Sequence, residues 1–178
     1  MGKRSEFVRT ERDFYPTPLK AAQPLFPHLA PQTRFIEPCA GDGRLTRYLV
    51  AAEHVCVYQC DLLPMRHDID QADALAIEDT GQRARGIVFI TNPPWLRSQL
   101  HPLIDHLSNI APTWLLFDAD WVHTKQSAPF MDRLVSIVSV GRVKWIEATK
   151  HTGKDNCAWH LFDSAHTGPA EFHGRTAA

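Results

Sequence analysis

Asn92, Pro93, Pro94 and Trp95 form a short segment in which an amide, two rigid residues and an aromatic ring directly follow the apolar run GIVFIT. Proline has no backbone N–H, and it disfavours helix for the residue before it. Two consecutive prolines therefore end a strand and hold the next residues in one conformation. One interpretation is a stiff turn with Trp95 in the core; the other is a pocket that binds a flat, nitrogen-bearing ring.

A second group of residues with possible chemistry lies in FIEPCAGDGRL, where Glu37 is followed by a loop that contains Gly41 and Gly43. Glycine lets a backbone approach a ligand closely, and the N-terminus of a following helix offers free N–H groups. Glu37 and Asp42 would repel a phosphate, so a cationic ligand with an ammonium group fits this loop better. A plain strand–helix turn is the alternative interpretation.

Two aspartates extend this candidate site. Asp61 ends the run VCVYQCD, where a carboxylate can accept both hydroxyls of a ribose, as in dinucleotide-binding folds. Asp73 precedes an Ala-Leu pair, so it can accept from an adenine amino group while Leu75 packs on the ring. The alternative for Asp61 is a helix cap or a solvated turn residue. Together the two aspartates and the glycine loop describe a site for a positively charged adenosine derivative.

These motifs resemble those of class I S-adenosylmethionine-dependent methyltransferases. DFYPTP (13–18), FIEPCAGDG (35–43), Asp61, Asp73 and NPPW (92–95) occur in the order and spacing of that family, and most closely resemble the amino-methylating DNA adenine-N6 enzymes. The tail SVGRVKWIEATKHTGKDNCAWHLFD, with EFHGR, further resembles compact enzymes of this group from phages and prophages. The resemblance covers nearly the whole chain, and Asn-Pro-Pro-aromatic is its most specific element. Trp95 stands where Tyr or Phe is commoner.

The resemblance implies roles for individual residues around the cofactor S-adenosylmethionine. The residues that would contact it are Tyr15 and Thr17 at its methionine end, with Asn92 beside them, then Glu37, Cys39 and Gly41 around its amino acid moiety, Asp61 at the ribose and Asp73 at the adenine. The catalytic residues would be Asn92, Pro93, Pro94 and Trp95. No metal is expected.

Methylation of an adenine amine explains why such a segment is needed. The amine is a poor nucleophile because its lone pair is delocalised into the ring. The Asn92 side-chain oxygen and the Pro93 carbonyl can each accept one of its N–H bonds, which pulls the nitrogen toward tetrahedral geometry and aims its lone pair at the sulfonium methyl. The prolines hold the acceptors rigidly, so little reorganisation is needed during transfer. Trp95 would stack on the base after it has left its duplex.

The elements that must position these residues alternate along the chain. Strand-like runs occupy residues 33–38, 54–61, 86–92, 113–120, 137–146 and 156–163, and helical apolar stripes occupy 44–53 and 98–110, with Pro102 expected in the first turn of the second helix. This alternation predicts an α/β fold with a doubly wound, Rossmann-like, mainly parallel sheet. The last two strands lack a helix between them, which predicts an antiparallel hairpin at the C-terminal edge.

Candidate contacts to nucleic acid are Trp121, Lys125, Lys150 and Lys154. A core position is the alternative for Trp121, and plain solvation is the alternative for the lysines. The histidines at 123, 151, 160, 166 and 173 lack the spacing of metal ligands, and we predict them to be surface or loop residues. Only 83 residues follow NPPW, so we predict no separate recognition domain and a short or relaxed sequence preference, read by the loops 122–129 and 147–156.

Composition sets wider limits. The chain has 178 residues, of which 44% are hydrophobic, and we predict one domain over residues 1–178. The net charge of −1 gives no general argument for a nucleic-acid partner. No apolar stretch approaches the roughly 20 residues that span a bilayer, and the N-terminus lacks a secretion signal, so we expect a cytoplasmic protein without membrane attachment.

The four cysteines are too scattered for a disulfide framework. Cys56 and Cys60 are predicted to share one face of a strand with Tyr58. Zinc would need two further ligands, and His67 is the only candidate nearby. We therefore expect buried, reduced thiols.

Two alternatives to a DNA adenine-N6 methyltransferase remain at this stage, a different substrate and a subunit without catalytic activity. An Asn-Pro-Pro-aromatic segment recognises a planar N–H₂ group and does not by itself distinguish deoxyribose, so RNA or a protein amide is a possible substrate. A cofactor-binding subunit without catalytic activity is a further alternative, although the complete NPPW segment argues against it. A homodimer or a partner subunit is a possible source of longer sequence recognition.

Overall fold

A computed structural model of the chain describes residues 15–145 and 153–175. Its strands are β1 (Arg34–Glu37), β2 (Val55–Asp61), β3 (Asp70–Gln71), β4 (Ile87–Thr91), β5 (Thr113–Asp118), β6 (Leu134–Arg142), β7 (Asn156–Phe162) and β8 (Glu171–His173). Its α-helices are α1 (Leu19–Ala22), α2 (Arg44–Ala51) and α3 (Arg97–Ile110). Short 3₁₀ segments are η2 (Gln23–His28), η3 (Ala74–Ala76), η4 (Arg83–Arg85), η5 (Ala119–His123) and η6 (Lys125–Arg133).

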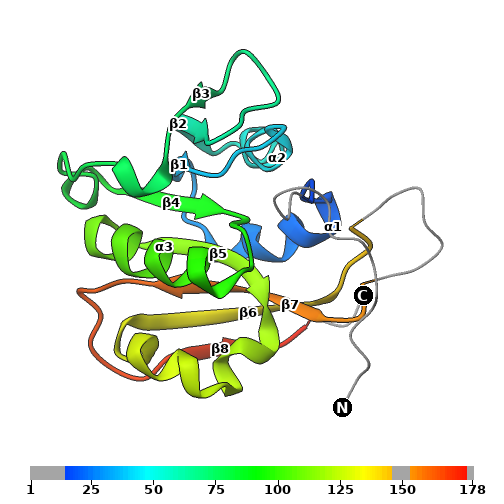
Figure 1. Ribbon diagram of the computed structural model, residues 1–178, viewed down its shortest axis with the longest axis vertical. Coiled ribbons are helices and arrows are strands. Elements are labelled where there is room, and N and C mark those ends of the chain that lie inside the picture. Colours follow the sequence, from blue (N-terminus) through cyan, green and yellow to red (C-terminus); the bar gives the residue numbers. More distant parts are fainter. Residues whose placement is uncertain (1–14, 146–152, 176–178) are drawn as a thin grey trace.

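All eight strands of the described residues belong to one sheet with the order β3-β2-β1-β4-β5-β7-β6-β8 (Figure 1). The strands from β3 to β5 are mutually parallel, while β7 is antiparallel to both β5 and β6. The predicted α/β fold with a mainly parallel, Rossmann-like sheet and an antiparallel C-terminal pair is therefore confirmed.

The position of the antiparallel pair differs from the prediction, which placed a hairpin at the edge of the sheet. β7 lies between β5 and β6, and the edge is formed by β8, which pairs in parallel with β6. Five of the seven side chains of β7 are buried, so this strand needs neighbours on both sides and packing on both faces. β6 also begins and ends earlier than the predicted run 137–146.

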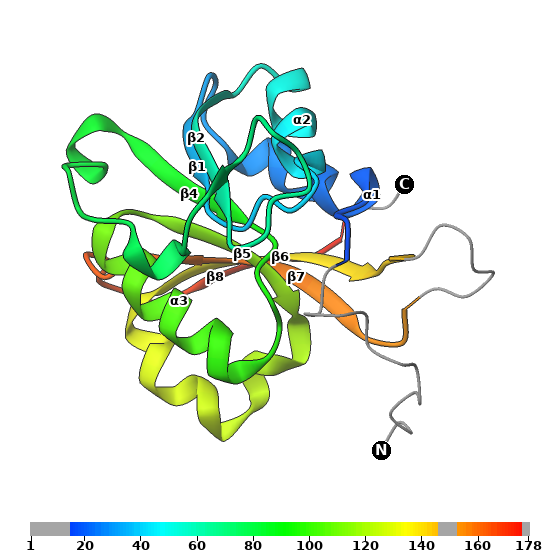
Figure 2. The ribbon, with the colours of Figure 1, turned by 45° about the horizontal axis from the view of Figure 1, so that its top comes forward.

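Helices cover both faces of the sheet (Figure 2). α1 and α2 pack on one face through a core cluster that includes Leu25, Leu45, Leu49 and Trp159. α3 covers the other face with Leu100, Leu103, Ile104 and Leu107, the stripe predicted from their spacing. Burial of each such side chain stabilises the fold by about 1.5–3 kcal/mol. Pro102 lies in the second turn of α3, one turn later than predicted.

A bulge in β2 overturns the prediction that Cys56, Tyr58 and Cys60 share one face. Phe35 of β1 pairs with Cys56, but the next residue, Ile36, pairs with Tyr58, so Val57 is an extra residue in β2. The bulge sends Cys56 to the core cluster of Phe35, whereas Tyr58 packs with Ile36 on the opposite face. Within the described residues, no group of three His, Cys, Asp or Glu side chains is arranged to hold a metal ion.

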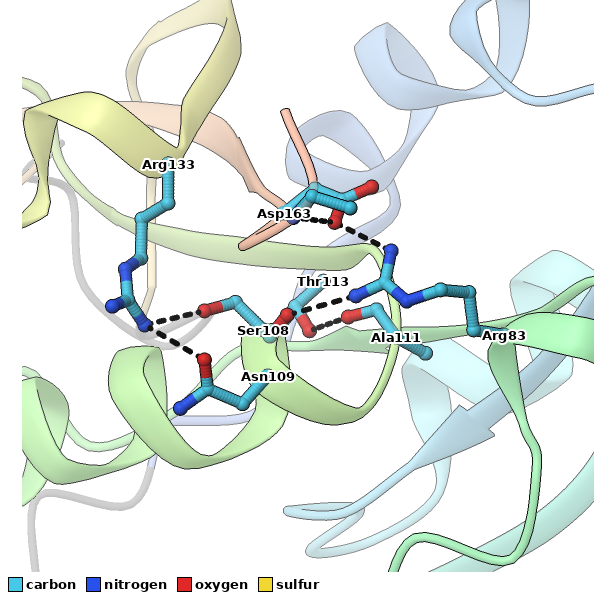
Figure 3. Close-up of polar contacts among 8 residues, drawn as sticks. Arg83, Ser108, Asn109, Ala111, Thr113, Arg133 and Asp163 are labelled. Carbon is cyan, nitrogen blue, oxygen red and sulfur yellow. Dashed lines mark hydrogen bonds and ion pairs between the residues drawn. The ribbon is translucent and has the colours of Figure 1, made fainter. Parts of the chain in front are cut away.

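Polar contacts join three segments that connect strands to the C-terminal end of α3 (Figure 3). Arg83 forms an ion pair with Asp163 at 2.5 Å and donates to the Ser108 carbonyl at 3.1 Å. Arg133 donates to the Ser108 hydroxyl at 3.2 Å and pairs with Asp105 at 2.8 Å. Cations near the last carbonyls of a helix also interact favourably with its dipole. These contacts fasten η4, η6 and the end of β7 to one helix.

His160 is a core residue, contrary to the prediction of a surface or loop position. Its side chain is fully buried in β7 and stacks on Phe117 with ring centroids 3.9 Å apart. Burial lowers the pKa of His160 to about 3, so the imidazole is neutral at physiological pH. The flat, uncharged ring therefore packs here like an aromatic side chain. His151, from the same prediction, lies outside the described residues.

Among the described residues, no helix is both long enough and apolar enough to cross a bilayer.

Candidate active site

The candidate site lies at the carboxyl ends of β1, β2 and β4. β1 is flanked by β2 and β4, and all three strands run in the same direction. Their last residues therefore meet at one edge of the sheet, where ligands bind in open α/β folds. This topology brings Glu37, Asp61 and Asn92 together although they are far apart in the sequence.

The loop after β1 is held in shape by hydrogen bonds to the backbone of Gly41. Gly41 and Gly43 have φ angles of +55° and +71°, a region that favours glycine. The Gly41 N–H donates to Asp61 Oδ2 at 2.8 Å, and the Gly41 carbonyl accepts from the Met65 N–H at 3.0 Å. Gly43 directly precedes α2, so the loop leads into the N-terminus of that helix. The predicted glycine turn is present, and it is fastened to the end of β2.

The Asp61 carboxylate accepts hydrogen bonds from two loops. Besides the Gly41 N–H, its Oδ1 accepts from the Leu63 N–H at 2.8 Å. A carboxylate has about four acceptor positions, so both oxygens retain capacity for ligand hydroxyls. The sequence predicts Asp61 as a ligand contact, and it does not predict that Asp61 also holds the glycine loop.

Asp73 lies further along the same edge and is exposed. Its carboxylate caps η3 by accepting from the Leu75 N–H at 2.9 Å. It also lines a cavity of about 530 Å³ between η3 and the sheet face formed by Ile36, Tyr58 and Ile87. Of the residues predicted to contact the cofactor, only Asp73 reaches this cavity. The cavity therefore adjoins the candidate site at Asp73 and does not coincide with it.

Glu37 is the most perturbed acidic side chain of the site. It is 2% exposed at the end of β1, and its Oε2 accepts from the Thr46 hydroxyl of α2. Burial raises the pKa of Glu37 to about 8, with smaller upward effects from Asp42 and Asp61, while the hydrogen bond from Thr46 opposes the rise. The nearby Cys39 thiol also has a raised pKa, mainly because of burial. A cation bound here would favour the ionised carboxylate, which suits the ammonium group of an amino acid.

The Asn92 amide is held in one orientation by the segment before α1. Its Nδ2 donates to the Tyr15 carbonyl at 3.3 Å and lies 3.2 Å from Thr17 Oγ1. A backbone carbonyl can only accept, so the amide nitrogen must face Tyr15, and Oδ1 faces away from it. Oδ1 is thus an oriented acceptor with two lone pairs. One of them takes the indole N–H of Trp95 at 3.2 Å.

Trp95 packs against a second indole that sequence reasoning did not select. The rings of Trp95 and Trp145 are perpendicular, at 89°, with centroids 5.5 Å apart. Both rings are partly exposed. Trp145 lies just after β6 in the run RVKW, within the segment on which the resemblance to phage-type enzymes rests. The side chain of Pro93 is buried and that of Pro94 is half-buried, so the segment is firmly seated.

Of the four residues predicted to contact nucleic acid, the structure describes Trp121, Lys125 and Lys154. Trp121 is 2% exposed, and its indole N–H donates to His101 Nε2 at 3.0 Å. This burial favours the core alternative for Trp121, because stacking on a base would require the ring to leave a packed cluster with Phe117 and Phe162. Lys125 and Lys154 are exposed. Lys150 lies outside the described residues.

Comparison with protein-family models found no match, and no curated protein matches the sequence. Solved structures do match in fold. PH1948 from Pyrococcus horikoshii, a candidate RNA methyltransferase, aligns with a TM-score of 0.59 and 16% identity over 92% of this chain and 91% of its own. The 23S rRNA methyltransferase ErmE aligns with a TM-score of 0.57 and 15% identity over 86% of this chain and 71% of its own.

A third match is a modification subunit of a candidate type I restriction enzyme from Vibrio vulnificus YJ016, with a TM-score of 0.57 and 12% identity. The alignment covers 93% of this chain and 48% of that one, so the chain spans about half the length of the modification subunit. At identities this low, the matches show a shared fold and nothing finer. That fold is the Rossmann-like fold of methyltransferases.

Proposed function

We propose that this protein is an S-adenosylmethionine-dependent N-methyltransferase that methylates adenine N6 in DNA. The observation that carries the proposal is the orientation of Asn92 at the end of β4. Tyr15 and Thr17 hold its amide nitrogen, which leaves Oδ1 as an oriented acceptor for an N–H bond. An acceptor of this kind beside a glycine loop and two acidic strand ends matches the requirements of amine methylation.

The residues around the loop after β1 fit S-adenosylmethionine by their chemistry. Glu37 would bind the ammonium group, because its buried carboxyl is ionised most readily next to a cation. Asp61 would accept the ribose hydroxyls and Asp73 the adenine amino group. Gly41 and Cys39 would lie along the amino acid moiety, while Tyr15 and Thr17 would approach its methionine end. When bound, this cofactor supplies a methyl group on a positively charged sulfur.

The chain itself would orient the target amine. Asn92 Oδ1 and the Pro93 carbonyl would each accept one N–H, which directs the nitrogen lone pair at the methyl carbon. The N–C bond forms as the S–C bond breaks, and the bonding electrons remain on sulfur. The methylated amine is then acidic and loses one proton to solvent, so no strong general base is needed. Catalysis of this type depends on positioning, and pre-set acceptors minimise reorganisation.

Adenine in DNA is the preferred substrate in this proposal because of the NPPW segment and the resemblance of the tail to phage-type adenine enzymes. RNA is the second candidate, favoured by the fold match to the 23S rRNA methyltransferase ErmE. A dimethyladenosine transferase from Plasmodium falciparum also matches in fold, with a TM-score of 0.52.

All strands of the described residues form one sheet, which supports a single catalytic domain.

The proposal includes a short or relaxed sequence preference. Base edges in the major groove are usually read by a dedicated helix, ribbon or domain. Here the candidate reading elements are the loop 122–129, with exposed Lys125, and the β6–β7 connection, with exposed Lys154. A homodimer or a partner subunit would extend the site. Methylation of a random duplex library, scored by position, tests this point; a strict preference over six or more base pairs by the isolated chain would contradict it.

The deciding experiment is nucleoside mass spectrometry after incubation with methyl-labelled S-adenosylmethionine. The protein is incubated separately with random-sequence DNA and with total RNA, each digested to nucleosides. Labelled N6-methyldeoxyadenosine is the expected product. Label in RNA alone would replace DNA by RNA as the substrate. Label in neither, with cofactor binding intact by calorimetry, would favour a non-catalytic cofactor-binding subunit.

A further inference from the structure

We propose that Arg175, which follows the edge strand β8, contacts a phosphate of the DNA backbone beside the candidate active site. The inference rests on the proposed function, because it names a surface that would hold the DNA for methylation. β8 lies next to β6 at the edge of the sheet (Figure 1), and Arg175 comes two residues after its end. The motif EFHGR (171–175) contains this strand and ends at Arg175.

Burial of apolar surface does not account for β8. Glu171 is exposed and the Phe172 side chain is 69% exposed, so two of the three side chains of this strand add little to the core. Only His173 packs inward, with its ring centroid 4.4 Å from that of His28 in η2. A short strand can serve simply to cover the edge of β6, which is the alternative explanation. That alternative requires nothing of Arg175.

The Arg175 side chain lies across Gly141 of β6. Gly141 has a φ angle of +84°, and a Cβ atom on it would lie 3.1 Å from Arg175 Nη1 and 3.3 Å from Arg175 Cδ. A larger residue at position 141 would therefore push the arginine aside. Within the part of the chain that the structure describes, no carboxylate pairs with this guanidinium. Its planar fork of N–H donors, placed but not used, suits a phosphate.

The register of the sheet places Arg175 on the same edge as Asn92. One row of paired residues crosses the sheet from β4 to β8: Thr91, Leu115, His160, Ile137 and Phe172. β4 and β8 run in the same direction, so Asn92 lies one residue beyond this row and Arg175 three residues beyond it, about 10 Å. Gly141 is three strand spacings from β4, about 14 Å. A DNA strand rises about 3.4 Å per nucleotide, so Arg175 would meet a phosphate a few nucleotides from the target base.

Other charges at this end of β6 support the same partner. Arg142, the last residue of β6, and Lys144 are both exposed. Three cations thus lie near the ends of two paired strands, although the net charge of the chain is −1. A local excess of positive charge attracts a polyanion even where the net charge does not.

Substitutions at Arg175 separate phosphate binding from a structural role. Arg175→Gln removes the charge, whereas Arg175→Lys keeps it. Arg34→Gln is the matched control, because Arg34 is also exposed but lies at the start of β1, on the opposite edge of the sheet. Binding of a labelled random-sequence DNA duplex is followed by fluorescence anisotropy over a range of salt concentrations. Urea unfolding of each variant shows whether its stability has changed.

One lost phosphate contact makes the slope of log affinity against log salt shallower by about 0.9 for duplex DNA, which is about an eightfold loss of affinity at 0.1 M salt. Arg175→Gln should show this change with an unchanged midpoint of urea unfolding. Arg175→Lys should keep the slope of the wild type, and so should Arg34→Gln. In methyl transfer, Arg175→Gln should raise the KM for DNA and leave kcat unchanged.

An unchanged slope in Arg175→Gln would overturn the inference. An equal change of slope in Arg34→Gln would also overturn it, because the loss of net charge alone would then explain the result. A lower midpoint of urea unfolding in Arg175→Gln with an unchanged slope would assign Arg175 a structural role instead.

The salt dependence of binding does not require turnover, so it separates this inference from the proposed function. If the wild type methylates neither DNA nor RNA, the proposed function fails. The inference about Arg175 is then decided by the slopes alone, and it falls if the wild type does not bind the duplex. The same titration with random-sequence RNA tests the other nucleic acid: a change of slope in Arg175→Gln with RNA alone would overturn DNA as the partner.

Discussion

The pH dependence of stability at Glu37 follows directly from its burial. The pKa of this carboxyl rises from its ordinary value of 4.5 to about 8 in the folded protein. The folded state therefore holds the proton more tightly than the unfolded state. The contribution to stability is complete below pH 4.5 and is lost progressively as the pH rises to about 8. Since each pKa unit is worth about 1.4 kcal/mol, the full loss is on the order of 5 kcal/mol.

Glu37→Gln removes this titration while preserving an acceptor for the Thr46 hydroxyl. The variant and the wild type should have similar free energies of unfolding near pH 5. The variant should become more stable by several kcal/mol as the pH approaches 9. Urea denaturation of both proteins at intervals from pH 5 to 9 measures this difference, and Glu78→Gln, at an exposed position, controls for loss of a negative charge.

Binding of S-adenosylmethionine should reverse the effect, because its positive charges favour the ionised carboxylate. Cofactor affinity of the wild type should therefore increase between pH 6 and 8 with release of a proton, whereas Glu37→Gln should bind weakly with little dependence on pH. The reasoning is refuted if the stability difference between Glu37→Gln and the wild type stays constant from pH 5 to 9. It would then follow that Glu37 ionises in the folded protein as easily as in water.

Three further changes test other parts of the structure. Asp73→Ala should weaken S-adenosylmethionine binding about tenfold by calorimetry, while Asp73→Asn, which keeps an acceptor and the cap on η3, should lose less affinity. If Asp73→Ala binds the cofactor as tightly as the wild type, Asp73 is not part of the cofactor site. Thr17→Val removes one of two contacts to Asn92 Nδ2 and should slow methyl transfer about 2- to 10-fold without changing the midpoint of urea unfolding; an unchanged rate would mean that the Tyr15 carbonyl alone orients the amide. Arg83→Ala removes the ion pair with Asp163 and the hydrogen bond to the Ser108 carbonyl, so it should lower the free energy of unfolding by about 1–2 kcal/mol and leave kcat unchanged. A loss of activity in the folded variant would contradict a purely structural role for Arg83.

The parallel half of the sheet could be predicted because its signals are local. Apolar runs end in polar residues at Glu37, Asp61 and Asn92, and parallel strands place such ends at one edge. This rule alone predicts that the three residues lie together in the candidate site. β8 could not be predicted, because it has only three residues and Phe172 at its centre is 69% exposed. Its strand conformation comes from pairing with β6 and not from its own apolar pattern.

Other features depend on contacts that no short stretch of sequence contains. The faces of Cys56 and Tyr58 follow from a bulge at Val57, and a bulge is defined by the register of the neighbouring strand. His160 has a polar side chain, but its stacking on Phe117, close to Phe162, makes it a core residue. The pairing of Trp145 with Trp95 likewise joins residues fifty positions apart. In each case tertiary packing overrides the preference of the single residue.

The most direct test of the account is single-turnover methyl transfer by Asn92→Ala. The central claim is that Asn92 Oδ1, oriented by Tyr15 and Thr17, accepts an N–H bond of the target amine. Loss of one pre-organised polar contact to the reacting group typically costs about 10²–10³-fold in rate. The account therefore predicts a loss of that size in the transfer of labelled methyl to DNA, with S-adenosylmethionine affinity within a few-fold of the wild type. A transfer rate close to that of the wild type, in a variant that binds the cofactor normally, would contradict it.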